Sequence, residues 1–129
     1  MDKTLELKLQ EFQKAIDSLK EALQTQKNDL IRDSSIKRFE YSFELLWKTT
    51  KIYLSVVFGV DVFSPKECFR ELRRNQKISD SDTEGLLKMA DDRNEIIHTY
   101  NEKFADELYV KIKKEYYGLM ELVLKIIKA

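Results

Sequence analysis

Turn-forming residues are scarce in this 129-residue chain, which contains three glycines and one proline. Strand-rich architectures need such residues at their many turns and are therefore poorly supplied here. The single cysteine, Cys68, excludes an intrachain disulfide and a cysteine-based metal site, and it suits a reducing compartment. Long apolar runs are also missing, since the longest, residues 122–127, is interrupted by Lys125. The first residues lack the apolar segment of a signal peptide, so we expect a soluble cytoplasmic protein without membrane contact.

Neither sign of charge is in excess, because 23 basic side chains balance 23 acidic ones. Such a chain has no global field that attracts nucleic acid. Locally, five basic and two acidic side chains give residues 64–78 a charge of +3, whereas two basic and seven acidic ones give residues 79–102 a charge of −5. The basic side chains Arg70, Arg73, Arg74 and Lys77 form either a local basic surface or, more simply, one solvated helix face.

Apolar residues at helical spacing are abundant, and they predict long amphipathic helices. The first stripe consists of Leu5, Leu9, Phe12, Ile16, Leu19 and Leu23. The second consists of Ile36, Phe39, Phe43, Leu46, Thr50, Tyr53 and Val57. The last consists of Phe104, Leu108, Ile112, Tyr116, Leu119, Val123 and Ile126. The last helix is apolar on further sides, so it is either the central element of the fold or an oligomer contact.

Start and stop signals separate these stripes. Residues 24–28 are polar and predict a loop, and Gly59 predicts the end of the second helix. Ser64-Pro65-Lys66-Glu67 predicts the start of a short helix, because serine caps orphan N–H groups, proline fits the first position and Glu67 can complete a capping box. Acidic residues at 80–82 favour another helix start, and Asn101 can cap the last helix. The length suits one domain over residues 1–129, and the fold class expected is all-α, an antiparallel up-and-down four-helix bundle with one short extra helix.

The helix expected over about residues 80–100 carries an arginine on its apolar stripe. That stripe is Leu86, Met89 or Ala90, Arg93, Ile96 or Ile97, and Tyr100. A buried guanidinium is costly unless it meets an anion or hydrogen-bond acceptors. Arg93 therefore either binds an anionic ligand or pairs with Glu40 or Glu44 of the second helix.

His98, the only histidine, shares a helix face with Asn94 one turn earlier. Arg93 and His98 are five residues apart, so on an ideal helix they point about 140° apart and are offset by about 7.5 Å. They converge on one phosphate only if the helix end unwinds or a second copy contributes. A twofold cleft would suit phosphodiester chemistry: one histidine accepts a proton from a 2′-hydroxyl, the other protonates the leaving oxygen, and arginine stabilises the charge.

The sequence Arg93-Asn94-x-x-x-His98-x-Tyr100 resembles the Arg-polar-x3-His-x-Tyr motif of HEPN domains (higher eukaryotes and prokaryotes nucleotide-binding). Two further stretches resemble the branch named nucleotidyltransferase substrate-binding proteins. They are Arg38-Phe39-Glu40-Tyr41-Ser42-Phe43-Glu44-Leu45-Leu46-Trp47-Lys48 and Ser64-Pro65-Lys66-Glu67-Cys68-Phe69-Arg70-Glu71-Leu72. The three stretches occur in the family's order, and the resemblance spans about residues 5–127.

This resemblance implies a homodimer formed through the motif helix. It also implies a nucleotide- or RNA-binding subunit that works beside a separately encoded minimal nucleotidyltransferase, as half of a toxin–antitoxin-type pair. In toxin members the HEPN protein is a metal-independent ribonuclease, and the partner neutralises it by occlusion or by adding adenylate to the motif tyrosine. Carried over, Arg93 and His98 are catalytic candidates with Asn94 in support. The same residues and Tyr100 would bind nucleotide or RNA, Tyr100 is the modifiable hydroxyl, and no metal or cofactor is expected.

Structural interpretations stand beside each of these assignments. Trp47 and the tyrosines at 41, 53, 109, 116 and 117 could stack on bases, but aromatics at helical spacing are usually core. Asp91 and Asp92 diverge by about 100° on a helix, which favours solvated carboxylates over a metal site. Tyr100 either projects its hydroxyl past the helix end or continues the apolar stripe into the core. Cys68 is expected to serve packing, although a helix start can lower a thiol pKa.

Overall fold

Helices account for all the regular structure of residues 1–129 in the computed structural model, and no strand is present. In chain order the elements are α1 (Lys3–Gln24), α2 (Asp29–Phe58), α3 (Pro65–Arg74), α4 (Asp80–His98), α5 (Glu102–Lys111), the π-helical segment η1 (Ile112–Tyr116) and α6 (Tyr117–Lys128). The predicted all-α class is therefore confirmed.

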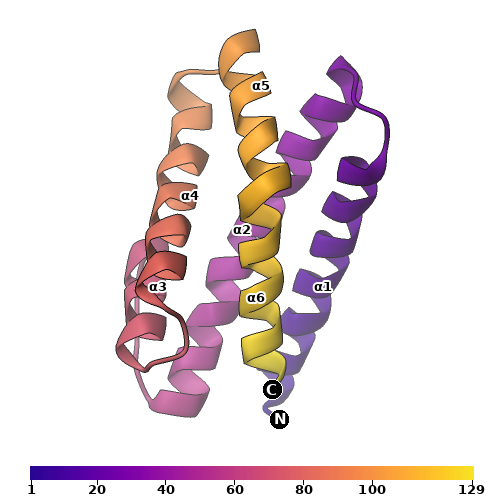
Figure 1. Ribbon diagram of the computed structural model, residues 1–129. Helices are drawn as coiled ribbons and strands as arrows, with labels where there is room; N and C mark the ends of the chain where they lie inside the picture. The colour runs from indigo at the N-terminus through magenta and orange to yellow at the C-terminus, as the bar shows by residue number, and fades with distance from the viewer.

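Four long helical columns run up and down (Figure 1). α1 and α2 form an antiparallel hairpin with the most extensive packing in the molecule, α4 runs antiparallel to α2, and α5, η1 and α6 form one continuous last column. The short α3 packs beside α2 and α4. The two termini lie at the same end, and the α1–α2 and α4–α5 connections lie together at the opposite end (Figure 1). This is the expected bundle with one short extra helix.

The helices begin and end at the capping residues that the sequence predicted. Gly59 ends α2 in the left-handed conformation at φ 66°, which suits a residue without Cβ. The Ser64 hydroxyl accepts from the backbone N–H of Glu67 at 3.3 Å, and the Asn101 side chain caps α5. The Glu67 carboxylate also reaches back, but it accepts from the N–H of Phe63 at 3.4 Å instead of from Ser64. The capping box is therefore displaced by one residue.

One cluster of 30 buried apolar side chains forms the core, with contributions from every long helix. All six residues of the predicted α1 stripe are buried. In α2 the predicted stripe is buried except for Val57, which is 53% exposed near the end of the helix. Apolar burial of this extent is the main stabilising contribution to the fold. None of the helices is both long and apolar enough to cross a membrane.

The π-helical segment in the last column changes which residues face the core. The backbone N–H of Tyr117 bonds to the carbonyl of Ile112, five residues earlier, so the turn contains one residue more than an α-helical turn. Beyond this point the predicted core residues Leu119 and Ile126 are only half-buried. The buried residues of α6 are instead Met120, Val123, Leu124 and Ile127. The predicted α6 stripe is thus wrong by one position after Tyr116, although Val123 lies on both stripes.

The last column packs against all three other long columns, α1, α2 and α4. Its further apolar residues Leu119, Leu122 and Ile126 pack against the core. Of the two interpretations of its wide apolar surface, the structure therefore favours the central element over an oligomer contact.

Candidate nucleotide-binding site at the end of α4

The last turns of α4 carry the motif residues to one end of the bundle. The helix ends at His98, where the Thr99 N–H donates to the carbonyl of Glu95 at 2.9 Å and the Thr99 hydroxyl donates to the Glu95 carboxylate at 3.1 Å. Asn101 then caps α5 immediately. The connection is therefore only three residues long, and it fixes Tyr100 between two helix ends.

Arg93 points toward α2, as its place on the apolar stripe predicted. Its side chain is 19% exposed, and Nη2 lies 3.9 Å from the Glu40 carboxylate, which makes an ion pair at a distance too long for a hydrogen bond. Nε is buried and has no hydrogen-bond partner. Glu44, the other predicted partner, pairs with Lys48. The guanidinium is therefore only weakly paired within the chain.

Asn94 and His98 are both exposed. Asn94 lines a hollow of about 200 Å³ together with Phe43, Ala90 and the first residues of α3. The His98 side chain is exposed and forms no hydrogen bond or ion pair within the chain. No contact joins Arg93 and His98, so one chain does not bring the two catalytic candidates together.

Tyr100 combines features of both predicted placements. Its side chain is 48% exposed, and its ring packs edge-on against Phe104, with centroids 6.4 Å apart. The hydroxyl donates to Asp33 Oδ1 of α2 at 3.1 Å. Partial burial and the adjacent Asp33 carboxylate both raise the pKa of Tyr100, so the phenol is protonated at neutral pH.

A buried arginine that the sequence analysis missed organises this end of the bundle. Arg32 is only 2% exposed, and its guanidinium donates to Glu102 at 2.6 and 3.2 Å, to Asp106 at 3.2 Å and to Asp33 at 3.0 Å. These carboxylates raise its pKa further, so the charge is permanent. Bidentate pairing of this kind is directional and holds α2 against α5. The signal was available, because Arg32 lies four residues before Ile36 on the α2 stripe.

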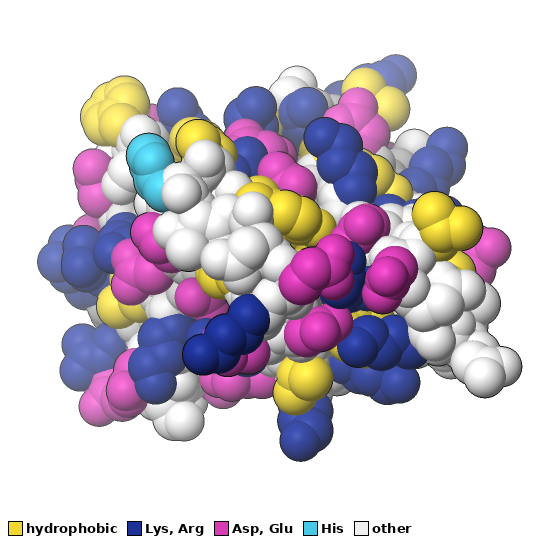
Figure 2. Space-filling model, turned by 90° about the horizontal axis from the view of Figure 1, so that it is seen from above, with side chains coloured by type: hydrophobic (Ala, Val, Ile, Leu, Met, Phe, Trp, Pro, Cys, Tyr) yellow, Lys and Arg dark blue, Asp and Glu magenta, His cyan; other side chains and the backbone are white.

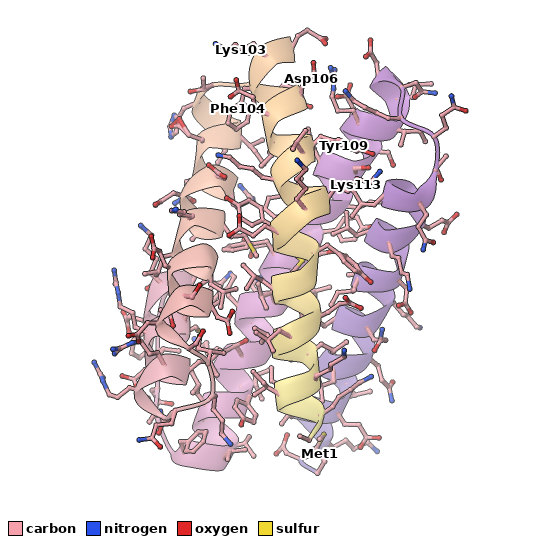
Figure 3. The ribbon with its side chains drawn as sticks, in the orientation of Figure 1. Met1, Lys103, Phe104, Asp106, Tyr109 and Lys113 are labelled. Carbon is pink, nitrogen blue, oxygen red and sulfur yellow. The ribbon has the colours of Figure 1, made fainter.

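The same network extends to the α1–α2 connection. Lys27 donates to Asp106 at 3.1 Å and lies over the Tyr109 ring, 5.6 Å from its centroid. Lys27 and Arg32 hold the pKa of Asp106 below its usual range. Phe104 points from α5 toward α4, and Asp106 points toward α2 (Figure 3). From above, the single histidine lies at one side, and acidic side chains gather nearer the middle (Figure 2).

Other residues singled out from the sequence have structural partners. Asp91 pairs with Lys66 at 2.6 Å, and Asp92 accepts from Lys111 at 3.3 Å and from the Tyr116 hydroxyl. No group of three metal-binding side chains is positioned to hold an ion. Burial raises the pKa of Cys68 to about 12, so this thiol serves packing as expected.

The residues of the predicted basic surface are partly neutralised. Arg73 pairs with Asp80 and Arg74 with Glu71, and Lys77 lies over the Phe58 ring. The pairing with Arg73 holds the pKa of Asp80 below its usual range. These contacts favour the interpretation as a solvated helix face.

The family described as nucleotidyltransferase substrate binding protein like matches residues 7–129. A Thermus thermophilus protein of known crystal structure is 35% identical to the chain, with a TM-score of 0.85 over 92% of this chain and 99% of that one. No curated protein matches.

Two further similar structures come from toxin–antitoxin complexes. One is a tri-AMPylated Shewanella oneidensis HEPN toxin in complex with its MNT antitoxin, at 19% identity and a TM-score of 0.79 over 99% of this chain and 98% of that one. The other is a toxin–antitoxin crystallised with AMP-PNP, at 18% identity and a TM-score of 0.80 over 100% and 99%. At these identities the likeness establishes a common fold. The chain therefore belongs to the nucleotidyltransferase substrate-binding-protein-like family and has the fold of HEPN toxins.

Proposed function

We propose that this chain is the helical partner subunit of a separately encoded minimal nucleotidyltransferase, and one half of a toxin–antitoxin-type pair in the cytoplasm. Residues 1–129 form its single HEPN-like domain, which binds a nucleotide or RNA at the end of α4. One observation carries the proposal: the complete motif Arg93, Asn94, His98 and Tyr100 lies around the end of α4 in a chain of this family. The complex of the Shewanella oneidensis HEPN toxin with an MNT antitoxin supports the choice of partner.

The ligand chemistry follows from the donors at the site. His98 and Asn94 are exposed, and the partly exposed Arg93 makes only a long ion pair with Glu40. These are donors suited to phosphate oxygens, which recur in every nucleotide and RNA. Because Arg93 and His98 face different sides of α4, we propose that a second copy completes the cleft through a twofold axis.

The second candidate is a ribonuclease that needs no metal. An exposed imidazole without internal partners favours it, because such a group can accept the proton of a 2′-hydroxyl. The second copy's histidine would protonate the leaving 5′-oxygen, and Arg93 would stabilise the charge on the phosphorus centre. The products would then end in a 2′,3′-cyclic phosphate.

Modification of Tyr100 supplies a route to regulation. We propose that the partner transfers adenylate to this half-exposed hydroxyl, and the tri-AMPylated state of the Shewanella oneidensis toxin supports adenylate as the group. The added phosphodiester is negative and bulky, so it would occupy the space that an RNA phosphate needs.

Growth assays separate the two candidates. The chain is expressed without and with its nucleotidyltransferase partner, beside His98→Ala and the distant surface variant Lys20→Ala as control. A ribonuclease stops growth when expressed alone, and only His98→Ala abolishes the effect. Unimpaired growth with intact RNA supports the binding subunit, and failure of the purified chain to bind either nucleotide or RNA contradicts both.

A further inference from the structure

Asp33 is the one polar partner of the Tyr100 hydroxyl. The phenol oxygen lies 3.1 Å from Asp33 Oδ1, although the two residues are 67 positions apart in the chain and come from α2 and the α4–α5 connection. The contact lies at the open end of the bundle, where Tyr100 is 48% exposed and the Asp33 side chain is 51% exposed. A second protein or a nucleotide can therefore reach the tyrosine oxygen while the carboxylate touches it.

The carboxylate is held in place from the other side. Asp33 Oδ1 also accepts from Arg32 Nε at 3.0 Å, and Arg32 is itself fixed by Glu102 through two hydrogen bonds. Asp29, the other carboxylate of α2 near Arg32, lies 3.7 Å from the guanidinium and has no contact with Tyr100. Two acidic residues four positions apart thus share one arginine, and only one of them touches the tyrosine oxygen.

The surroundings make a free phenolate costly. Partial burial raises the pKa of Tyr100, the hydrogen bond and charge of Asp33 raise it further, Glu40 adds to this, and Arg32 opposes it. All three charged groups belong to α2, and the α5 side chain in contact with the ring is the uncharged Phe104. An attacking tyrosine oxygen must therefore lose its proton while its new bond forms, and a group within hydrogen-bond reach has to accept that proton.

We propose that Asp33 is the proton acceptor in the nucleotidylation of Tyr100, an inference that rests on the modification proposed above. The Tyr100 oxygen attacks the α-phosphorus of a nucleoside triphosphate presented by the nucleotidyltransferase. The new O–P bond forms as the bond between the α-phosphorus and the oxygen bridging to the β-phosphate breaks, and pyrophosphate leaves. The proton passes from the Tyr100 hydroxyl to Asp33 Oδ1 and then to solvent. The chain would thus contribute a catalytic group to its own modification.

The test compares Asp33→Asn with Asp29→Asn in the complex with the nucleotidyltransferase and ATP. An asparagine oxygen can still accept from Arg32 and Tyr100 but cannot take up the proton, so the initial rate of Tyr100 modification at pH 7 should fall by about 100-fold or more. Asp29→Asn should stay within about twofold of wild type. Asp33→Glu, which keeps a carboxylate, should retain more activity than Asp33→Asn. A thermal melt of each variant checks that the bundle is folded.

The pH profile separates proton transfer from mere positioning. In Asp33→Asn the modification rate should rise about tenfold per pH unit toward the tyrosine pKa, because phenolate must form first, and the wild-type rate should rise less. Equal rates for Asp33→Asn and wild type would overturn the inference, as would equal losses in Asp29→Asn or in Asp33→Glu. If wild-type Tyr100 is unmodified by an active partner, the proposed modification fails together with the inference. Adenylate that still appears on the Tyr100→Phe variant must be attached to another residue.

Discussion

Arg93 and His98 lie on the same helix in two different environments. The arginine faces α2 and the core, where its ion pair with Glu40 leaves Nε without a partner. The histidine is exposed and forms no hydrogen bond or ion pair within the chain. Arginine is an unfavourable residue at a position that serves packing alone, because its charge is costly to bury without full pairing. An anion bound beside the guanidinium, as proposed above, would supply the missing counter-charge.

The proposed ribonuclease mechanism uses side chains of the protein in place of a metal ion. We expect cleavage of RNA to continue in EDTA, because proton transfer by His98 and charge stabilisation by Arg93 replace a metal ion. His98→Ala should lower the rate by about 100-fold or more. Denaturing gels and analysis of product ends provide the measurement. Activity lost in EDTA and restored by magnesium would contradict the mechanism.

Tyr100 should be the residue modified by the partner. Its hydroxyl is half-exposed and lies between the ends of α4 and α5, so a second protein can approach it. Mass spectrometry of the chain co-expressed with the nucleotidyltransferase should place adenylate on Tyr100, and Tyr100→Phe should remain unmodified. Tyr41, which is 40% exposed on α2, serves as an internal control that should stay unmodified. Adenylate found only on other residues would leave occlusion as the mode of neutralisation.

Arg32 should matter more for stability at neutral pH than at acid pH. Arg32→Met leaves the carboxylates of Asp33, Glu102 and Asp106 close together without their cation, so its Tm should be several degrees below that of wild type at pH 7. Lys27 and Arg32 lower the folded-state pKa of Asp106, so this stabilisation is present above the unfolded value of about 4 and is lost as the pH falls through the folded value. The Tm difference should therefore shrink near pH 3.

Thermal melts of Arg32→Met and of the exposed control Arg70→Met at both pH values make this comparison. Arg70 has no ion pair in the structure, and its replacement should leave Tm unchanged. An Arg32→Met variant as stable as wild type at pH 7 would show that the network makes no net contribution to stability.

At the scale of whole elements, local chemistry predicted the boundaries well. Gly59, Ser64 and Asn101 act as caps because each satisfies backbone groups within a few residues, and such interactions are visible in sequence. The π-helical turn at Ile112–Tyr116 is different. There Tyr116 stacks on Phe39 of α2, with centroids 5.8 Å apart, and donates to Asp92 of α4. Partners from two other helices accompany the extra residue, so periodicity within the segment did not predict it.

The two helical glycines near this turn offer a matched pair. A Cβ at Gly118 meets nothing within 4 Å, so Gly118→Ala should stabilise the bundle by about 0.5–1 kcal/mol by reducing the freedom of the unfolded chain. A Cβ at Gly85 would lie 2.8 Å from Leu119 Cδ1 and 3.1 Å from Glu115 Oε1. Both side chains must move, so Gly85→Ala should gain less or lose stability. Chemical denaturation measures both changes, and an equal gain would show that α4 does not depend on this close approach.

At the scale of the whole molecule, the site is assembled from residues that the sequence keeps far apart. The motif around Arg93 and His98 was evident because it is contiguous and follows one helix. Asp33 and Arg32 belong to the same end of the bundle, but their contacts with Tyr100 and Glu102 span 67 and 70 positions. Periodicity predicts which face of a helix is buried, and it does not predict which two helix ends meet. The motif could therefore be predicted and the carboxylate beside its tyrosine could not.

Because the Arg93 and His98 side chains lie on different sides of α4, the proposed site depends on a dimer. The apolar residues of α6 pack against the core, whereas the end of α4 carries the residues that a second copy would complete. Ile97 is 72% exposed beside His98, so an apolar contact between two copies at this end of α4 would cover it. We therefore expect a dimer at micromolar concentration through the end of α4, detectable by light scattering.

Ile97→Glu should weaken this dimer at least about tenfold, or about 1.4 kcal/mol, because the twofold axis repeats both the lost apolar burial and the added charge. Val57→Glu is the matched control, since Val57 is 53% exposed near the other end of the bundle and should leave the dimer intact. If Ile97→Glu is monomeric and also loses nucleotide or RNA binding, the cleft is shared between copies. A wild-type monomer that binds nucleotide or RNA would instead require the end of α4 to unwind, because only then can Arg93 and His98 of one chain reach the same phosphate.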